Sequence, residues 1–394
     1  MLNTPFSPWP SFTEQEVTAV SEVLRSNKVN YWTGQEGRSF EKEFAEFCDS
    51  QYAIAVANGT LALDLALEML DIKQGDEVIV TSRTFIASIS SIVNCGATPV
   101  FADVELDSQN ISANTISKVL SAKTKAIMCV HLAGWPCEMD EIMSLADKHS
   151  LLVIEDCAQA HGTKYKGRPV GSIGHVGAWS FCQDKIMTTG GEGGMVTTND
   201  ETLWRKGWAY KDHGKSFAAV YETQHPPGFR WLHESFGTNW RLTEMQSAIG
   251  RIQLTRMGQW KESRNDNANK IRELCKNYSW LLVPEVPSYI EHAFYKCYVH
   301  VNLEKLPKEF SRDSIIEELV QQGIPCFSGS CSEVYKEKAF ENTNFAPKED
   351  LKNARILGKN SLMFLVHPTL TSDEIDKTCQ TLTKVFSNID RFTK

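Results

Sequence analysis

Short apolar segments of strand type alternate with amphipathic helical segments through the first half of this chain. The segments "AIAVANG" (53–59), "KAIMCVHL" (125–132) and "LLVIEDCAQAHG" (151–162) are almost continuously apolar before they reach polar residues. Between them, "TLALDLALEML" (60–70) and "MDEIMSLADKHS" (139–150) have helical spacing. Strands that are apolar on both faces are typical of a mostly parallel sheet with helices on both faces. We therefore predict an α/β protein whose ligand site lies beyond the carboxyl ends of its strands.

The second half of the chain predicts a smaller domain. A helical segment at 241–277 leaves the first domain, and "AFYKCYVHV", "SRDSIIEELVQQG" and "SLMFLVH" follow it as strand and helix patterns. We expect a large α/β domain over 13–255 and a smaller α+β domain over 256–394. Residues 1–12 are expected to pack beside the smaller domain.

The first helix is predicted to begin at Thr13, which forms a capping box with Glu16. Its apolar residues Val17, Val20 and Leu24 fall on one face of that helix.

Charge and cysteine content limit the class of protein. The chain has 394 residues, with 41 Lys and Arg against 49 Asp and Glu, so its net charge of −8 argues against a nucleic-acid-binding surface over the whole chain. Its 11 cysteines include no CxxC pair, which favours a reduced, cytoplasmic protein and gives no reason to expect a bound metal. We expect neither a signal peptide, given the uncharged start, nor a membrane span, which needs about 18 apolar residues.

One lysine stands between a predicted strand and a glycine-rich stretch, in "SFCQDKIMTTGGEGGMV" (180–196). Lys185 is either a surface charge or a reactive amine that needs partners elsewhere in the chain. Asp156 ends a buried strand, where a carboxylate is costly without a partner. It either caps a turn or keeps a ring nitrogen protonated, as the chemistry of pyridoxal phosphate (PLP) requires. Enzymes that use PLP hold it as a Schiff base to a lysine, so the pair predicts a PLP site.

A phosphate seat is predicted at a strand-to-helix junction. Gly59 and Thr60 would present free backbone N–H groups and the positive end of a helix to the phosphate. Many turns of this kind hold nothing, so the signal is weak when taken alone. The hydroxyl of Ser180 would add a donor to the phosphate, and the "TTGGEGG" turn (188–194) would keep bulk away from the cofactor.

Four segments in this order, "NGT.AL", "EDCAQAHG", "SFCQDKIMTTGGEGGM" and "GTNWRLTEMQSAIGRIQL", resemble the DegT/DnrJ/EryC1/StrS family of sugar aminotransferases, which are PLP enzymes of fold type I. The resemblance runs from about Trp32 to the C-terminal helix. It implies that Lys185 is the Schiff-base lysine and that Asp156 meets the pyridine nitrogen. The other cofactor contacts it implies are Gly59, Thr60 and Ser180 at the phosphate, Gln159 against the ring and its 3′ oxygen, Phe85 stacked on the ring, and Asn239 reaching the phosphate from a neighbouring subunit. A homodimer with shared active sites follows from the last contact.

The resemblance also implies the reaction. Family members take an amino group from L-glutamate and pass it to a keto or aldehyde sugar in a ping-pong cycle. Sugar dehydratases of the family carry histidine where the aminotransferases carry lysine, so Lys185 favours transamination.

The acceptor sugar stays open at this point. The segment 211–236 is longer than expected for the family and is rich in His, Lys and Arg, which suits a carboxylate or a diphosphate, although a solvated loop is also possible. One acceptor class is a nucleotide-linked 4-keto-6-deoxyhexose. The other is 8-oxo-Kdo, an acidic sugar of lipopolysaccharide whose amination gives 8-amino-3,8-dideoxy-manno-octulosonate, because several segments resemble that branch of the family. The candidate substrate contacts are His161, Lys211, His213, Lys215, Arg230 and His367. For His161 a buried structural role is favoured over a substrate contact, and His367 is similarly ambiguous.

Two alternatives remain. The loop "FSGSCSEV" (327–334) resembles the cysteine-bearing loop of cysteine desulfurases, which would make Cys331 a nucleophile. Those enzymes place a histidine directly before the lysine, whereas this chain has Asp184 there. A non-catalytic PLP-fold binding protein would lack the lysine or carry a DNA-binding domain, and the sequence shows neither feature.

Overall fold

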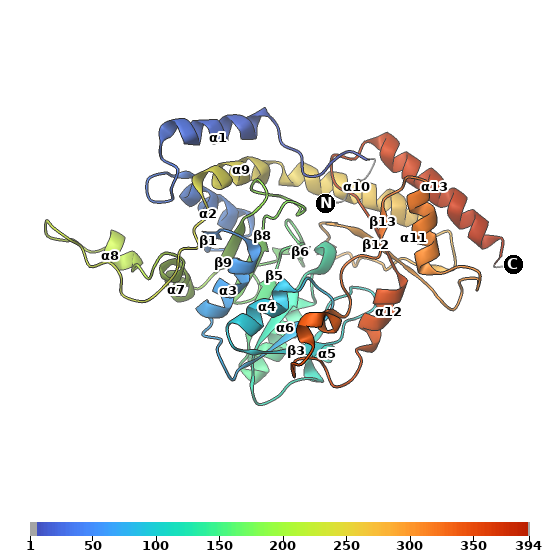
Figure 1. Ribbon diagram of the computed structural model, residues 1–394, viewed down its shortest axis with the longest axis horizontal. Coiled ribbons are helices and arrows are strands. Elements are labelled where there is room, and N and C mark those ends of the chain that lie inside the picture. Colours follow the sequence, from blue (N-terminus) through green and yellow to red (C-terminus); the bar gives the residue numbers. More distant parts are fainter. Residues whose placement is uncertain (1–5, 393–394) are drawn as a thin grey trace.

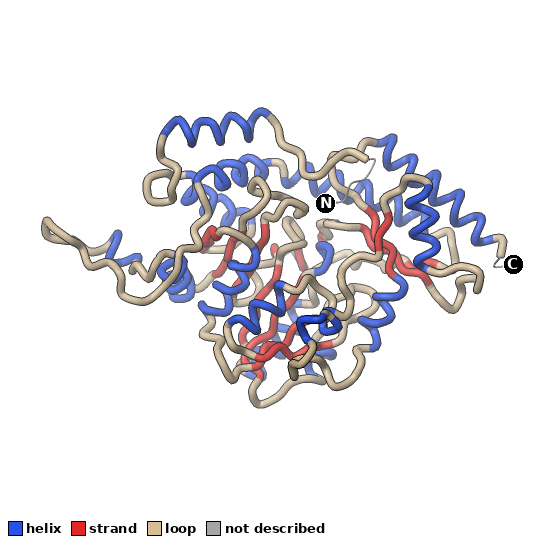
Figure 2. The backbone as a smooth tube through the Cα atoms, viewed as in Figure 1, coloured by secondary structure: helices blue, strands red, loops and turns tan. Residues whose placement is uncertain are grey.

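A seven-stranded sheet and a four-stranded sheet organise the computed structural model, which describes residues 6–392 (Figures 1 and 2). The larger sheet has the order β1-β9-β8-β5-β4-β2-β3. Its strands are β1 (Tyr52–Val56), β2 (Glu77–Thr81), β3 (Thr98–Ala102), β4 (Thr124–Val130), β5 (Leu152–Asp156), β8 (Val176–Ser180) and β9 (Gly194–Thr198). Only β9 runs against its neighbours in this sheet. The predicted, mainly parallel sheet is therefore confirmed.

Helices cover both faces of the larger sheet. One face carries α3 (Gly59–Met69), α4 (Ala87–Asn94) and α7 (Glu201–Lys211), and the other carries α2 (Glu36–Phe47), α5 (Ala113–Ser117) and α6 (Met139–His149). Successive side chains of a strand point to opposite faces. In β1, accordingly, Ile54 and Val56 join one apolar core, and Ala53 and Ala55 join the other. This double burial explains the continuous apolar runs in the sequence.

The four-stranded sheet is antiparallel and consists of β10 (Leu281–Leu282), β12 (Cys297–Val301), β14 (Ser361–Phe364) and β13 (Cys326–Phe327), in that order. The helices beside it are α10 (Met257–Cys275), α11 (Arg312–Gln321) and α13 (Ser372–Asp390). The predicted helical segment 241–277 is two helices, α9 (Glu244–Thr255) and α10, which meet at Arg256. A third, small sheet pairs β11 (Ile290–Glu291), β6 (Lys164–Tyr165) and β7 (Arg168–Pro169).

Packing divides the chain less cleanly than the predicted boundary at residue 255. The short helices η2 (Val334–Lys336) and η3 (Lys338–Phe340) and the helix α12 (Lys352–Asn360) place side chains in apolar cores on the two faces of the larger sheet. Near the N-terminus, the Ser7 N–H donates to Glu374 Oε1 at 2.6 Å, which sets this segment beside α13. Residues 1–5 and 393–394, which the predicted segments 1–12 and 256–394 include, lie outside the described residues.

The first helix, α1 (Glu14–Ser26), begins with the predicted capping box of Thr13 and Glu16. It lies along α9, where Glu16 is buried and pairs with Arg256 at 2.7 Å. The apolar residues Val17 and Leu24 are more than half exposed, because α1 rests on α9 through its other side.

An extended loop over residues 222–236, here called the arm, follows α8 (Phe217–Tyr221) and projects from the body of the molecule at the left of Figure 1. Its side chains are almost all exposed. Within residues 6–392, no helix combines the length and the apolar character that a membrane crossing requires.

Candidate active site

The predicted site residues lie at or just after the carboxyl ends of β1, β5 and β8. Asp156 is the last residue of β5, Ser180 is the last residue of β8, and Gly59 follows β1 at the start of α3. Strand β8 pairs with β5 in parallel, with Ala178 beside Asp156. Lys185 lies in the turn after β8. The sheet therefore delivers these groups to one edge.

Asp156 is a buried carboxylate without an ion-pair partner among the described residues. Its Oδ2 accepts a hydrogen bond from Ser88 Oγ at 2.8 Å, and its Oδ1 accepts one from the Ala158 N–H at 3.2 Å. Burial raises the pKa of Asp156, and these hydrogen bonds and the charge of Lys185 counteract part of the rise. A protonated ring nitrogen would supply the missing counter-charge, so the environment of Asp156 fits a pyridinium.

Lys185 is held at its backbone while its amine stays accessible. The Trp9 Nε1–H donates to the Lys185 carbonyl at 2.7 Å, and the Lys185 N–H donates to the Cys182 carbonyl at 3.1 Å. The amine lies 3.6 Å from Asp184 Oδ1 and 5.4 Å from the centre of the Tyr295 ring, and the side chain is 17% exposed. Tyr295 donates its hydroxyl hydrogen to Asp184. Asp184 and Tyr295 therefore orient the Lys185 amine, and Asp156 forms no direct ion pair with it among the described residues.

The first turn of α3 packs tightly against the end of β8. Asn58 caps the helix, its Oδ1 accepting from the Leu61 N–H at 2.9 Å. A Cβ at Gly59 would lie 2.5 Å from the Cβ of Ser180, so no larger residue fits there without movement. Ser180 Oγ accepts from the Cys182 N–H at 3.3 Å, which leaves its hydrogen free to donate. The free N–H groups of a helix start beside a hydroxyl donor fit a phosphate group.

The glycines after Lys185 form the predicted tight turn, and clearance around a cofactor stays a prediction. A Cβ at Gly193 would overlap the Thr189 side chain, and a Cβ at Gly194 would overlap the carbonyl of Asn58. Gly190 and Gly191 have φ of +89° and +122°, which residues with a Cβ rarely adopt. These glycines therefore permit a tight turn and the approach of β9 to the Asn58 turn.

Gln159 and Phe85 border the same edge. The Gln159 Oε1 accepts from the Ala133 N–H at 2.9 Å, which fixes the amide. Phe85 precedes α4, the helix that supplies Ser88, and its ring is 69% exposed. Asn239 is exposed beyond the arm, and its contact with a second subunit stays a prediction.

Lys211 has a structural position in place of the expected substrate contact. Its side chain is fully buried, with Nζ 3.3 Å from Glu41 Oε1 and 4.0 Å from the centre of the Tyr31 ring. Glu41 also accepts hydrogen bonds from the Ala55 N–H and the Tyr31 hydroxyl. The pair ties α7 to α2, and we do not retain Lys211 as a substrate residue.

The other cationic candidates of the segment 211–236 lie near or on the arm. Lys215 is 3.2 Å from Asp212 Oδ1 and lies over the Trp32 ring, with 4.2 Å to the centre. His213 is exposed with φ of +61°, and Arg230 is exposed on the arm. Of these three candidates, Arg230 alone belongs to the arm, which projects from the body in Figure 1, and a substrate contact stays a prediction for each of them.

The two remaining histidine candidates are buried and neutral. His161 lies 5.2 Å from Trp179 and 5.7 Å from Phe181 between ring centres, and burial lowers its pKa to about 3. Neither of its ring nitrogens has a hydrogen-bond partner within residues 6–392. Burial likewise lowers the pKa of His367 to about 3. Its ring stacks on Trp9 with 5.9 Å between centres. His161 is thus a core residue, and His367 packs against Trp9.

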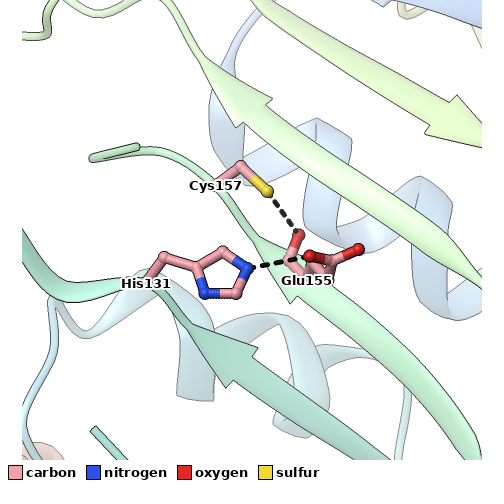
Figure 3. A group of neighbouring side chains, drawn as sticks. All are labelled: His131, Glu155 and Cys157. Carbon is pink, nitrogen blue, oxygen red and sulfur yellow. Dashed lines mark hydrogen bonds and ion pairs between the residues drawn. The ribbon is translucent and has the colours of Figure 1, made fainter. Parts of the chain in front are cut away.

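Figure 3 shows His131, Glu155 and Cys157, a buried group with the composition of a metal site. His131 accepts from the Cys137 N–H at its Nδ1 and lies 2.9 Å from Glu155 Oε2 at its Nε2, which therefore carries the proton. Glu155 also accepts backbone N–H groups of the 171–174 turn. Cys157 donates to the carbonyl of Glu155. Since the lone pairs that a metal would use are engaged, the group fastens the ends of β4 and β5.

Cys331 lacks the environment of an activated nucleophile. Burial is the largest influence on its thiol and raises its pKa, whereas reactive thiols have a lowered pKa. All 11 cysteines are free thiols. The desulfurase alternative therefore finds no support at this loop.

Sequence reasoning missed Ser88, Trp9 and Tyr295. Each comes from a segment far from Lys185 or Asp156 in the chain, and none stands in a pattern that signals its contact. Only "AFYKCYVHV" gave a signal for Tyr295, as the start of a strand.

Comparison with known proteins gives a consistent answer. Residues 10–383 match the model of the DegT/DnrJ/EryC1/StrS aminotransferase family. The chain is 35% identical over 387 residues to GDP-perosamine synthase of Escherichia coli O157:H7, covering 96% of this chain and 98% of that protein. A solved aminotransferase from Psychrobacter cryohalolentis is 67% identical with a TM-score of 0.96, covering 98% of this chain and all of that one. The PLP form of Spr1654 from Streptococcus pneumoniae, described as a sugar aminotransferase, is 25% identical with a TM-score of 0.85, covering 98% and 99%. The predicted fold type I is thereby confirmed.

Proposed function

The chain is a sugar aminotransferase that belongs to the DegT/DnrJ/EryC1/StrS aminotransferase family, and we propose that it uses PLP to move the amino group of L-glutamate to a keto or aldehyde sugar. The cofactor assignment rests on the groups that lie together at one edge of the larger sheet. There a buried carboxylate without a cation, an accessible lysine and a helix start packed on a serine lie together.

Each residue at this edge receives a task that its environment supports. PLP, when bound, supplies an electron sink for bonds at the substrate carbon next to nitrogen. Asp156 keeps the ring nitrogen protonated, which its unpaired, buried carboxylate favours. Ser180 and the first turn of α3 hold the phosphate. Gln159, fixed by the Ala133 N–H, lies against the ring edge, and Phe85 offers an exposed ring for stacking.

Lys185 holds the cofactor covalently and then moves protons between substrate atoms. Two features of the surroundings of Lys185 support this task. The carboxylate of Asp184 accepts a hydrogen bond from the Tyr295 hydroxyl, and its Oδ1 lies 3.6 Å from the Lys185 amine, which it orients. The anchored Lys185 backbone limits the amine to the reach of one side chain, so it returns to the same place after each transfer.

The acceptor belongs to one of two classes. The similarity to a GDP-perosamine synthase supports a nucleotide-linked 4-keto-6-deoxyhexose. The alternative is 8-oxo-Kdo, an acidic acceptor that would place the enzyme in lipopolysaccharide biosynthesis.

We further propose a homodimer with shared active sites. Phe229 and Trp231 of the arm are 79% and 83% exposed, with 4.8 Å between their ring centres. Apolar rings at the end of a projecting loop are stable when a partner surface covers them. A second copy would bury them and bring its Asn239 to the phosphate. The free thiols accord with the proposed cytoplasmic location.

Turnover of the purified protein tests this proposal. The enzyme with added PLP is incubated with L-glutamate and, separately, with a nucleotide-linked 4-keto-6-deoxyhexose or 8-oxo-Kdo. Formation of 2-oxoglutarate and of the aminated sugar is followed by mass spectrometry, with Lys185→Ala as the control. We expect amination of one acceptor and none by the variant. A wild-type enzyme that aminates neither sugar, or a variant as active as the wild type, would refute the proposal.

A further inference from the structure

Two lysine amines flank one aromatic ring beside the proposed cofactor site. Lys296 lies directly before β12, and its Nζ is 4.7 Å from the centre of the Tyr295 ring. The Nζ of Lys185 is 5.4 Å from the same ring centre. The Tyr295 N–H donates to the Ala133 carbonyl at 2.9 Å, so the position of Lys296 relative to the larger domain is fixed. Lys296 has no assigned task in the chemistry described above.

A buried guanidinium lies behind these amines. Arg264, on α10, donates from Nη1 to the carbonyls of Tyr295 at 3.3 Å and Phe294 at 3.5 Å. Its Nε and Nη2 have no hydrogen-bond partner among residues 6–392, and no described carboxylate pairs with it. A buried cation without hydrogen bonds to its remaining donors is costly, which indicates that an anion completes this environment when the enzyme is occupied.

The local charges do not balance. Asp184 already faces Lys185 and accepts from Tyr295, and Asp107, which lines a cleft with Lys296, forms no ion pair with it among the described residues. Asp156 is assigned to the ring nitrogen. Burial, and then the charge of Arg264, lower the pKa of Lys296 to about 8, and Asp184 offsets only part of this effect. One more negative group at this place would relieve the repulsion among the three cations.

Lys296 lines a narrow cleft between the turn after β4 and the strand β12. Its lining includes Leu132, Ala133 and Tyr298 along with Lys296, and its other charged residues are the carboxylate Asp107 and the cation Arg272. Ala133 is the residue whose N–H fixes Gln159, and Gln159 is the proposed contact to the cofactor ring. Because the amines of Lys296 and Lys185 lie 4.7 and 5.4 Å from the centre of the same Tyr295 ring, an anion held by Lys296 would lie within the reach of a small molecule attached at Lys185.

We propose that Lys296, backed by Arg264, forms a subsite that binds a substrate carboxylate next to Lys185. The inference rests on the proposed function, because it assumes that Lys185 and Asp156 serve the cofactor. Two substrates of the reaction could bring such a carboxylate: the amino donor, and an acidic sugar acceptor. The shared chemistry is one carboxylate paired with the ammonium group of Lys296.

Calorimetric titration with glutarate, a dicarboxylate without an amine, tests the subsite in the PLP-loaded protein. Lys296→Met removes the charge at nearly constant length, and Lys296→Arg retains a cation. Lys308→Met removes an exposed lysine as the matched control. We expect Lys296→Met to raise the Kd of glutarate about tenfold to hundredfold, the range for a hydrogen bond to a charged group. The arginine variant and the control should stay within about threefold. Equal Kd values for the wild type and Lys296→Met, with PLP binding unchanged, would overturn the proposal.

Steady-state kinetics then identify the source of the carboxylate. A raised KM for L-glutamate in Lys296→Met, with the KM of a nucleotide-linked keto sugar unchanged, assigns the subsite to the donor. A raised KM for 8-oxo-Kdo with that of glutamate unchanged assigns it to the acceptor. No change in any of these KM values contradicts the subsite. A wild-type enzyme that aminates neither sugar would refute the proposed function but not the subsite, because the glutarate titration tests the role of Lys296 separately.

Discussion

Replacing Gly59 by alanine is expected to disturb both stability and cofactor binding, because the end of β8 leaves no room for a side chain. The added Cβ would lie 2.5 Å from Cβ, 2.7 Å from Oγ and 3.0 Å from Cα of Ser180. Carbon atoms pack best at about 3.5–4.0 Å. The first turn of α3 and the end of β8 must therefore move apart by about 1 Å.

The magnitude follows from two opposing terms. Overpacking of this kind costs about 1–3 kcal/mol. Gly59 has no positive φ, so alanine also restricts the unfolded chain and returns about 0.4–1 kcal/mol. We expect the free energy of unfolding to fall by about 1–2 kcal/mol. The displacement also separates the helix start from Ser180, and the loss of one hydrogen bond to a charged phosphate would raise the Kd of PLP at least about tenfold.

Urea unfolding of the cofactor-free protein measures the first effect, and titration with PLP, followed by its absorbance, measures the second. Gly258→Ala is the matched control, because Gly258 lies in α10 and an added Cβ there meets no atom within 4 Å. That variant should keep the PLP affinity and lose no stability. If Gly59→Ala has the same free energy of unfolding and the same Kd for PLP as the wild type, both the tight packing of this turn and its assignment to the phosphate are refuted.

Three further perturbations test other parts of the site. Asp156→Asn removes the charge proposed for the ring nitrogen, so kcat for 2-oxoglutarate formation should fall about 100-fold or more, and an unchanged kcat would contradict that role. Lys211→Met leaves Glu41 buried without its cation, so urea unfolding should show a loss of about 3–5 kcal/mol, whereas wild-type stability with a raised acceptor KM would return Lys211 to the substrate site. His161 and His367 each have a pKa lowered to about 3, so the unfolded chain binds protons that the folded one does not, and stability falls as the pH drops from about 6.5 toward 3. Each histidine should cost about 2 kcal/mol at pH 5, and urea unfolding that is equally or more stable at pH 5 than at pH 7 would contradict their burial as neutral rings.

The sequence predicted the edge of the sheet because parallel strands place their carboxyl ends together. Asp156 and Ser180 end two strands that are paired in the sheet, and Gly59 follows a third, so pattern alone brought them to one place. The capping box at Thr13 was equally accessible, because it depends on residues three apart.

Contacts between distant segments could not be predicted in this way. Lys211 looked like a substrate cation because its partner Glu41 is 170 residues away in the chain, and only the folded structure shows the ion pair between the two. Lys296 and Arg264 come from a strand start and a long helix whose patterns carry no chemical signal. The exposure of Val17 was hidden as well, because an apolar helix face does not reveal whether its cover lies in the same chain.

Borohydride reduction of the PLP-loaded enzyme, followed by peptide mass spectrometry, tests the central claim that Lys185 carries the cofactor. Lys296 is a stringent internal comparison, because its amine lies near the same ring and its pKa is lowered to about 8. We expect a stable phosphopyridoxyl group on Lys185 in the wild type and no modified peptide in Lys185→Ala. Modification of Lys296 in the wild type, or the absence of any modified lysine, would contradict it.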